Sequence, residues 1–159
     1  MIASVAVGQL PAIGAPAPDF ELSNQFGEPV SLAALRGHAV VVVFYPFAFS
    51  SICTGEMCEL RDNLGEFATA DAKVLAISVD SKYSLRAYAA AEGLEFDLLA
   101  DFWPHGEVAR RYGVFDEVRG RAERGTFIID AAGILRAQFS SPSGQARPLA
   151  EYRRALAGL

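Results

Sequence analysis

The sequence predicts a single α/β domain with a central mixed sheet flanked by helices, and three observations carry this prediction. Residues 40–45 form an unbroken run of β-branched and aromatic residues, typical of a strand that is buried on both faces. Residues 73–79 form a second buried strand, which a helical pattern follows. Residues 125–130 and 134–139 form a hairpin across a short connection that contains glycine.

Composition excludes several classes of protein. The chain has 159 residues, of which 52% are hydrophobic, so it can bury a real core and does not have the composition of a disordered protein. The net charge of −5 gives no electrostatic footprint for nucleic acid or for an anionic membrane. The longest apolar run, residues 39–49, is too short to span a bilayer and is interrupted by Pro46. We therefore expect a cytoplasmic protein with neither nucleic-acid nor membrane partners.

The first part of the chain precedes the central strand. Residues 1–13 are small and apolar and lack the basic start of a secretory signal, so they are either a flexible extension or an over-long start. The domain itself is expected to cover residues 14–159. Its first elements are a hairpin of residues 20–22 and 29–31 and a short helical piece over residues 32–36.

The remaining elements follow from caps and periodicity. Ser50 or Ser51 caps a helix that begins after Pro46 ends the central strand, and Ser81 caps another that stops at Gly93. Three further elements are expected: a strand over 96–99, a helix ending near 112–113, and a terminal helix over 148–156 that starts at a proline. This order suits a thioredoxin-like fold, with no internal repeat and no linker.

Cys53 falls in the first turn of the helix that follows the central strand. The free N–H groups and the positive end of the helix dipole at this position favour an anion, and hence a thiolate. The thiolate is the nucleophilic and oxidisable form of cysteine. The competing interpretation is a buried packing residue, and placement alone does not separate the two.

The spacing Pro46-x-x-x-Ser50-x-x-Cys53 resembles the active-site motif of the peroxiredoxins, and the string YPFAFSSICTGEMCELRD looks most like their AhpE-type branch. The resemblance runs from about Gly14 to the end and is strongest at residues 44–62, 99–115 and 124–130. It implies that Cys53 is the peroxidatic cysteine, that the Ser50 hydroxyl binds and orients the peroxide, and that Pro46 shields the thiolate from water. The family more commonly carries threonine where Ser50 stands, and serine leaves the hydroxyl less constrained.

An arginine is also implied by this resemblance. Arg124 stands immediately ahead of the strand that begins GTF, where the family carries its essential arginine, and it would keep Cys53 ionised and stabilise the leaving oxygen. Arg119 and Arg121 are nearby candidates, but only Arg124 fits the motif; otherwise it is a surface arginine. Glu56 could fix an arginine through a forked pair, or it is simply a first-turn carboxylate that the helix dipole favours.

Cys58 lies five positions after Cys53. On an intact helix the two Cα atoms are roughly 8–9 Å apart, whereas a disulfide needs them within about 7 Å. CTGEMC resembles the C-x-x-E-x-C pattern of the PrxQ, or bacterioferritin-comigratory, branch, in which the second cysteine resolves the sulfenic acid after local unfolding. This implies a resolving role for Cys58, with helix-face packing as the alternative.

Partners and cofactors are also addressed by the sequence. No cofactor motif is present. The cysteine spacing and the positions of His38 and His105 do not match a thioredoxin-fold copper site, so no metal is expected. The resemblance implies a thioredoxin-like, mycoredoxin-like or low-molecular-weight thiol reductant. It also implies a homodimer, or an assembly of dimers, that uses residues 47–49 and 103–105.

The expected function is therefore a thiol-dependent peroxidase that reduces hydrogen peroxide, organic hydroperoxides or peroxynitrite through Cys53, with Cys58 as the resolving residue. Two alternatives stay open. One is a one-cysteine peroxiredoxin resolved by an external thiol. The other is a peroxide-sensing or chaperone protein with little turnover. A disulfide oxidoreductase is disfavoured, because no C-x-x-C pair is present.

Overall fold

The structure is a computed structural model that describes residues 9–142 and 144–159. Its elements, in chain order, are β1 (Glu21–Ser23), β2 (Pro29–Ser31), the 3-10 helix η1 (Ala33–Leu35), β3 (Ala39–Phe44), α1 (Ser51–Asp62), α2 (Leu64–Thr69), β4 (Ala72–Ser78), α3 (Lys82–Glu92), β5 (Asp97–Ala100), α4 (Glu107–Arg111), β6 (Phe115–Asp116), β7 (Arg121–Ala122), β8 (Gly125–Ile129), β9 (Leu135–Ser140) and α5 (Leu149–Ala157).

The central sheet has five strands in the order β5-β4-β3-β8-β9. β3 pairs parallel with β4, and β4 pairs parallel with β5, whereas β8 runs antiparallel to both β3 and β9. All six residues of β3 are buried, as its unbroken apolar run predicted. The mixed sheet and its helices confirm the predicted α/β, thioredoxin-like fold.

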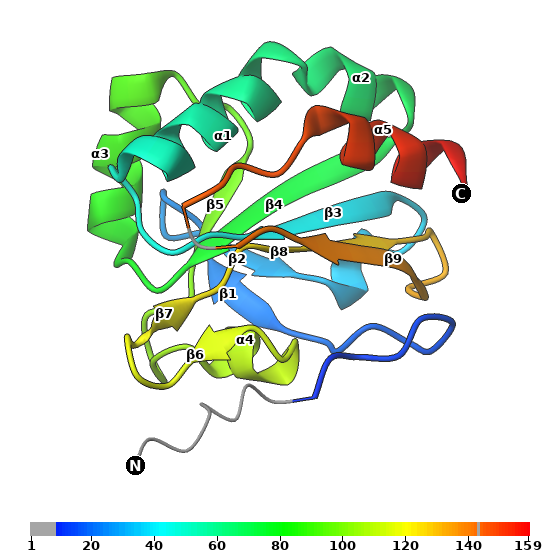
Figure 1. Ribbon diagram of the computed structural model, residues 1–159, viewed down its shortest axis with the longest axis horizontal. Helices are drawn as coiled ribbons and strands as arrows, with labels where there is room; N and C mark the ends of the chain where they lie inside the picture. The colour runs from blue at the N-terminus through cyan, green and yellow to red at the C-terminus, as the bar shows by residue number, and fades with distance from the viewer. Residues whose placement is uncertain (1–8, 143) are drawn as a thin grey trace.

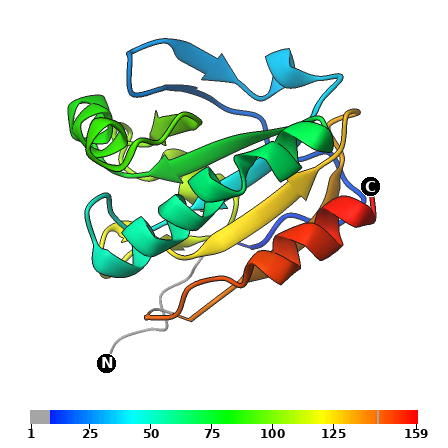
Figure 2. The same ribbon diagram turned by 90° about the horizontal axis from the view of Figure 1, so that it is seen from above.

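Other elements cover both faces of the sheet (Figures 1 and 2), and a hydrophobic layer lies on each face. Because successive side chains of a strand point to opposite faces, Val41 and Val43 pack with α1, α2, α3 and α5, whereas Val40 and Val42 pack on the other side. That second side is covered by β1, β2, α4 and the β6–β7 ribbon. The carboxyl end of β3 therefore delivers the chain directly to α1, at the edge of the first layer.

Local signals placed α3 correctly. The Ser81 hydroxyl accepts a hydrogen bond from the N–H of Ser84 at 3.2 Å, which satisfies one of the free donors of the first turn. Gly93 ends the helix at φ +64, a left-handed conformation that is strained for other residues. The hairpin of β8 and β9 and the helix that follows Pro148 were also predicted.

Two features were not predicted. α2 is a six-residue helix that buries only Phe67, so it has too few turns to show a period. The β6–β7 ribbon has two residues in each strand, which is too short for an alternating pattern.

The N-terminal segment joins the sheet at Gly14. The Gly14 N–H donates to the Leu135 carbonyl at 2.8 Å, and the Ala17 N–H donates to the Gly133 carbonyl at 2.9 Å. The extension predicted for residues 1–13 lies partly outside the described residues, because these begin at residue 9. No helix within the described ranges is long and apolar enough to cross a membrane.

Candidate active site

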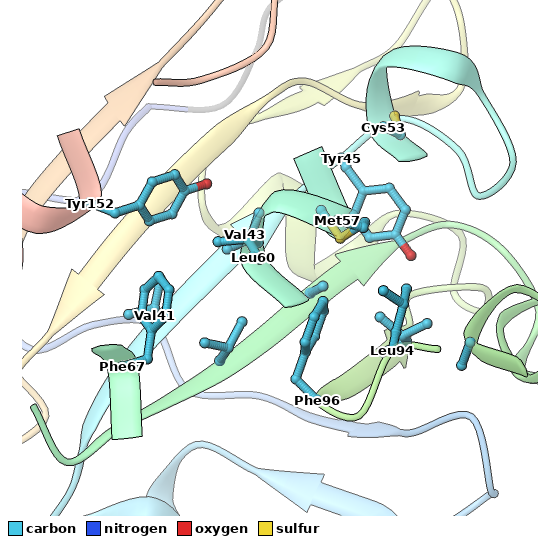
Figure 3. Packing of buried hydrophobic residues seen from close by; sticks show 14 of the residues in the cluster. Val41, Val43, Tyr45, Cys53, Met57, Leu60, Phe67, Leu94, Phe96 and Tyr152 are labelled. Carbon is cyan, nitrogen blue, oxygen red and sulfur yellow. The ribbon is translucent and has the colours of Figure 1, made fainter. Parts of the chain in front are cut away.

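Cys53 lies in the first turn of α1, and its side chain is completely buried. Figure 3 shows it in the core beside Tyr45 and Met57. β3 ends one residue before Tyr45, and buried Pro46 begins the short connection to α1. The Ala48 N–H donates to Asp80 Oδ2 at 2.8 Å, which fixes this connection to the loop after β4. The sequence therefore placed Cys53 correctly, at a helix start directly beyond the central strand.

Ser50 is the residue that precedes α1, but it does not cap the helix through its side chain. Its hydroxyl instead donates to the Phe47 carbonyl at 3.1 Å, within the turn that leads into the helix. The hydroxyl is thus held close to the start of α1, one turn before Cys53. Because the hydroxyl proton is donated to Phe47, the Ser50 oxygen can still accept a hydrogen bond from another group.

Glu56 lies three residues after Cys53, which places the two side chains on neighbouring positions of the helix surface. Its carboxylate is buried and accepts a hydrogen bond from Arg124 Nη1. Arg147 donates from Nε to Oε2 at 2.9 Å and from Nη2 to Oε1 at 3.1 Å. The forked pair considered for Glu56 therefore exists, but Arg147 makes the fork and Arg124 makes a single contact.

Arg147 is a site residue that sequence reasoning missed. It lies in the loop before α5, its side chain has no exposed surface, and its backbone N–H also donates to Glu56 Oε2 at 2.7 Å. Its Nη1 donates to Thr126 Oγ1 at 3.1 Å, and Thr126 in turn contacts the Tyr152 hydroxyl. No periodicity or spacing in the sequence marks this arginine, because its partner is 91 positions away.

The buried cluster of Glu56, Arg124 and Arg147 contains two guanidinium groups and one carboxylate. Burial alone would raise the pKa of the Glu56 carboxyl, but the hydrogen bonds and charge of Arg147, followed by the charge of Arg124, lower it. Burial opposes the charge of Arg147, yet the pKa of its guanidinium is raised by Tyr152, Glu56 and Cys53. The cluster therefore holds one positive charge in excess, and its carboxylate lies one helical turn from Cys53.

Arg124 also carries a donor that is not used. Its side chain is 6% exposed, and its Nε is buried without a hydrogen-bond partner among the described residues. A buried unsatisfied donor is rare and calls for an explanation.

Cys58 faces a different part of the structure. It is half-buried, and its Sγ lies 3.5 Å from Glu92 Oε1, at the end of α3. Burial, and then the hydrogen bond to Glu92, raise the pKa of the Cys58 thiol. Both cysteines are free, and α1 is continuous across them, so a disulfide between them requires α1 to unwind.

The other candidates lie elsewhere. Arg119 pairs with Asp116 at the surface, at 3.0 Å, and Arg121 belongs to β7. His38 contacts Asp71 at 3.0 Å, whereas the ring of His105 contacts the carbonyl of Gly120. Within residues 9–142 and 144–159, no three His, Cys, Asp or Glu side chains form a group that could hold a metal ion.

A free cysteine is buried at the start of a helix beyond the central strand, three residues before a carboxylate that binds two buried guanidinium groups. This arrangement is typical of a thiol-based redox protein of the thioredoxin-like fold. The AhpC/TSA family model matches residues 13–138. Alkyl hydroperoxide reductase E of Mycobacterium tuberculosis is 45% identical over 148 residues, which are 92% of this chain and 97% of that protein.

Two further similarities point the same way. Chloroplastic peroxiredoxin Q of Sedum lineare is 36% identical over 129 residues, which are 80% of this chain and 68% of that protein. The crystal structure of Enterococcus faecalis AhpC has a TM-score of 0.84 at 29% identity, and covers 92% of this chain and 90% of that one. The chain belongs to the AhpC/TSA family, the peroxiredoxins, and to their AhpE-type branch. It is a thiol-dependent peroxidase.

Proposed function

We propose that Cys53 is the peroxidatic cysteine of this peroxidase. The excess positive charge of the Glu56, Arg124 and Arg147 cluster, next to the first turn of α1, is the observation that carries the proposal. In the reaction, the Cys53 thiolate attacks one oxygen of a hydroperoxide and the O–O bond breaks. Cys53 becomes a sulfenic acid, and the other oxygen leaves as an alkoxide or hydroxide that takes up a proton.

Arg124 is proposed to stabilise the leaving oxygen, because its buried Nε is an unused donor. Ser50 is proposed to orient the peroxide from the start of α1, and Pro46 to keep water from the thiolate. Since Cys53 has no exposed surface, small peroxides are the expected substrates: hydrogen peroxide, organic hydroperoxides and peroxynitrite. The mycobacterial relative is named as an alkyl hydroperoxide reductase, which supports an organic hydroperoxide among them.

Cys58 is proposed to resolve the sulfenic acid. The Cys58 thiol gives up its proton and attacks the Cys53 sulfur as a thiolate, the S–S bond forms as the S–O bond breaks, and the hydroxyl takes up a proton and leaves as water. A thioredoxin-like, mycoredoxin-like or low-molecular-weight thiol in the cytoplasm then reduces the disulfide. The one-cysteine route remains the alternative, because Cys58 is held against Glu92 and an external thiol could react first.

We also propose a homodimer or an assembly of dimers. Phe47, Phe49 and Trp103 are 38%, 56% and 80% exposed, and Phe102 beside Trp103 is 52% exposed. Large apolar side chains gathered on exposed loops near a reactive site indicate a protein contact. Light scattering at tens of micromolar tests this, and a monomer would contradict it.

One mass measurement tests the catalytic proposal. The reduced protein is treated with one equivalent of peroxide under non-reducing conditions, with Cys58→Ala as the matched variant. Loss of two hydrogens from the parent, together with gain of one oxygen in Cys58→Ala, supports both roles. Gain of one oxygen in both proteins indicates the one-cysteine route, and no change in either protein contradicts the role of Cys53.

A further inference from the structure

Three polar contacts join α1 to α3 along one face of α1. The Tyr88 hydroxyl donates to Thr54 Oγ1 at 3.1 Å, and Cys58 Sγ donates to Glu92 Oε1 at 3.5 Å. Arg61 Nη1 donates to the Glu92 carbonyl at 2.6 Å. We call these three contacts the α1–α3 seam. Figure 1 shows α3 beside the first part of α1.

Two of the contacts of the seam advance in the same direction along both helices. Thr54 and Cys58 are four residues apart on α1, and their partners Tyr88 and Glu92 are four residues apart on α3. Side chains four apart lie on the same face of a helix, one above the other. The seam thus covers the segment of α1 that must unwind before Cys58 can reach Cys53.

The charges at the seam also bear on Cys58. The charged groups around its thiol are Glu92 from α3 and Arg61 and Asp62 from α1 itself. Glu92 and Asp62 disfavour a thiolate at this position, whereas Arg61 favours it. Because the thiolate is the form that attacks a sulfenic acid, the Glu92 carboxylate opposes the reaction as well as the movement.

We propose that Glu92 is a positioning residue that restrains Cys58 on α1 and so slows formation of the Cys53–Cys58 disulfide. This inference rests on the proposed resolving role of Cys58. The restraint keeps α1 folded and Cys53 ready for peroxide, and it lengthens the life of the Cys53 sulfenic acid. During that time a second hydroperoxide can transfer an oxygen to the sulfenic acid, which gives the sulfinic acid and an alcohol or water. Glu92 therefore sets the balance between the disulfide and over-oxidation.

The test compares Glu92→Gln with Glu95→Gln, an exposed glutamate three residues later that serves as the charge-matched control. Reduced proteins are mixed with one equivalent of peroxide, the reaction is quenched by alkylation at set times, and the mass of each product is measured by mass spectrometry. We expect Glu92→Gln to form the disulfide about two- to tenfold faster than the parent and to over-oxidise less at high peroxide. The pH profile of disulfide formation should move to lower pH. Glu95→Gln should match the parent, and the first attack by Cys53 should be unchanged in both variants.

A second variant separates restraint from charge. Tyr88→Phe removes the hydroxyl contact to Thr54 without changing any charge, so it should speed disulfide formation while leaving the pH profile in place. The proposal is overturned if the parent forms its disulfide but Glu92→Gln forms it no faster. It is also overturned if the pH profile of disulfide formation is the same in both proteins. A parent that consumes peroxide but forms no disulfide overturns the resolving role and this inference with it, while the peroxidase role of Cys53 stands.

Discussion

Cys53 and Cys58 are the same residue type on the same helix, yet their surroundings have opposite charge. Cys53 has no exposed surface and lies next to a buried cluster with more arginine than carboxylate. Cys58 is half-buried and faces the carboxylate of Glu92. The helix dipole favours an anion at the first turn. The charged groups that differ between the two cysteines come from Arg124 just before β8, from Arg147 in the loop before α5, and from Glu92 in α3. The elements that pack on each side of α1 therefore give the two cysteines different charged neighbours.

The largest effect on peroxide consumption is expected from removing Cys53, the cysteine near the two buried arginines. Cys53→Ser should abolish peroxide consumption, because serine has no comparable nucleophile at neutral pH. The fold should persist, since the change replaces one small buried side chain with another, and circular dichroism checks this. Cys58→Ser is the mirror variant and should still consume one equivalent of peroxide. Turnover by Cys53→Ser with any thiol donor would reverse the assignment of the two cysteines.

The positive charge near Cys53 can be reduced by substituting Arg124, which leaves both cysteines in place. Arg124→Gln should slow the first attack on peroxide about 100-fold, because the leaving oxygen loses a charged donor. Arg124→Lys should restore only part of the rate, since lysine keeps the charge but loses the guanidinium geometry. Stopped-flow kinetics measures the rate, and Arg119→Gln serves as a surface control. A rate for Arg124→Gln within about twofold of the parent would assign this function to another arginine.

The Glu56 carboxylate holds the two arginines together, and its titration gives a pH dependence. The folded-state pKa of Glu56 lies below its usual value of 4.5, because Arg147 and Arg124 outweigh burial. Its contribution to the free energy of unfolding is therefore present above the unfolded pKa and is lost as the pH falls through the folded pKa.

Glu56→Gln should lower the free energy of unfolding at neutral pH by about 3–5 kcal/mol, because a buried pair loses one partner. It should also flatten the loss of stability in acid. Urea unfolding between about pH 7 and pH 3 measures both effects. Glu66→Gln removes an exposed carboxylate paired with Arg153 and should change little. Equal acid sensitivity in the parent and Glu56→Gln would show that other carboxylates dominate.

The smallest effect is expected from Gly55→Ala, which tests whether α1 must unwind before Cys58 reaches Cys53. An added Cβ at Gly55 meets no atom within 4 Å, so Gly55→Ala fits without strain. Alanine stabilises a helix by about 0.5–1 kcal/mol relative to glycine, which should slow unwinding, and hence disulfide formation, about two- to fivefold. Attack by Cys53 should be nearly unchanged. Gly65→Ala in α2 is the matched control, because its Cβ also meets nothing. Disulfide formation at the parent rate in Gly55→Ala would mean that α1 does not need to unwind between the cysteines.

Much of the fold was predictable because its signals are local. The buried run of β3, the cap at Ser81, the stop at Gly93 and the β8–β9 hairpin each depend on residues close together in the chain. The position of Cys53 at the start of α1 follows from the same kind of evidence. α2 and the β6–β7 ribbon escaped prediction because they are too short to show a period.

The sequence by itself determined the α/β class, the family motif from Pro46 to Cys53, and the distance that separates two cysteines on one helix. The tertiary structure decided which groups surround each cysteine. The fork of Glu56 belongs to Arg147, 91 positions away, and the partner of Cys58 is Glu92, 34 positions away. Neither pair could be read from periodicity, since it arises only when the sheet brings α3 and the loop before α5 against α1. Burial at those contacts then sets the balance of charge on which the chemistry depends.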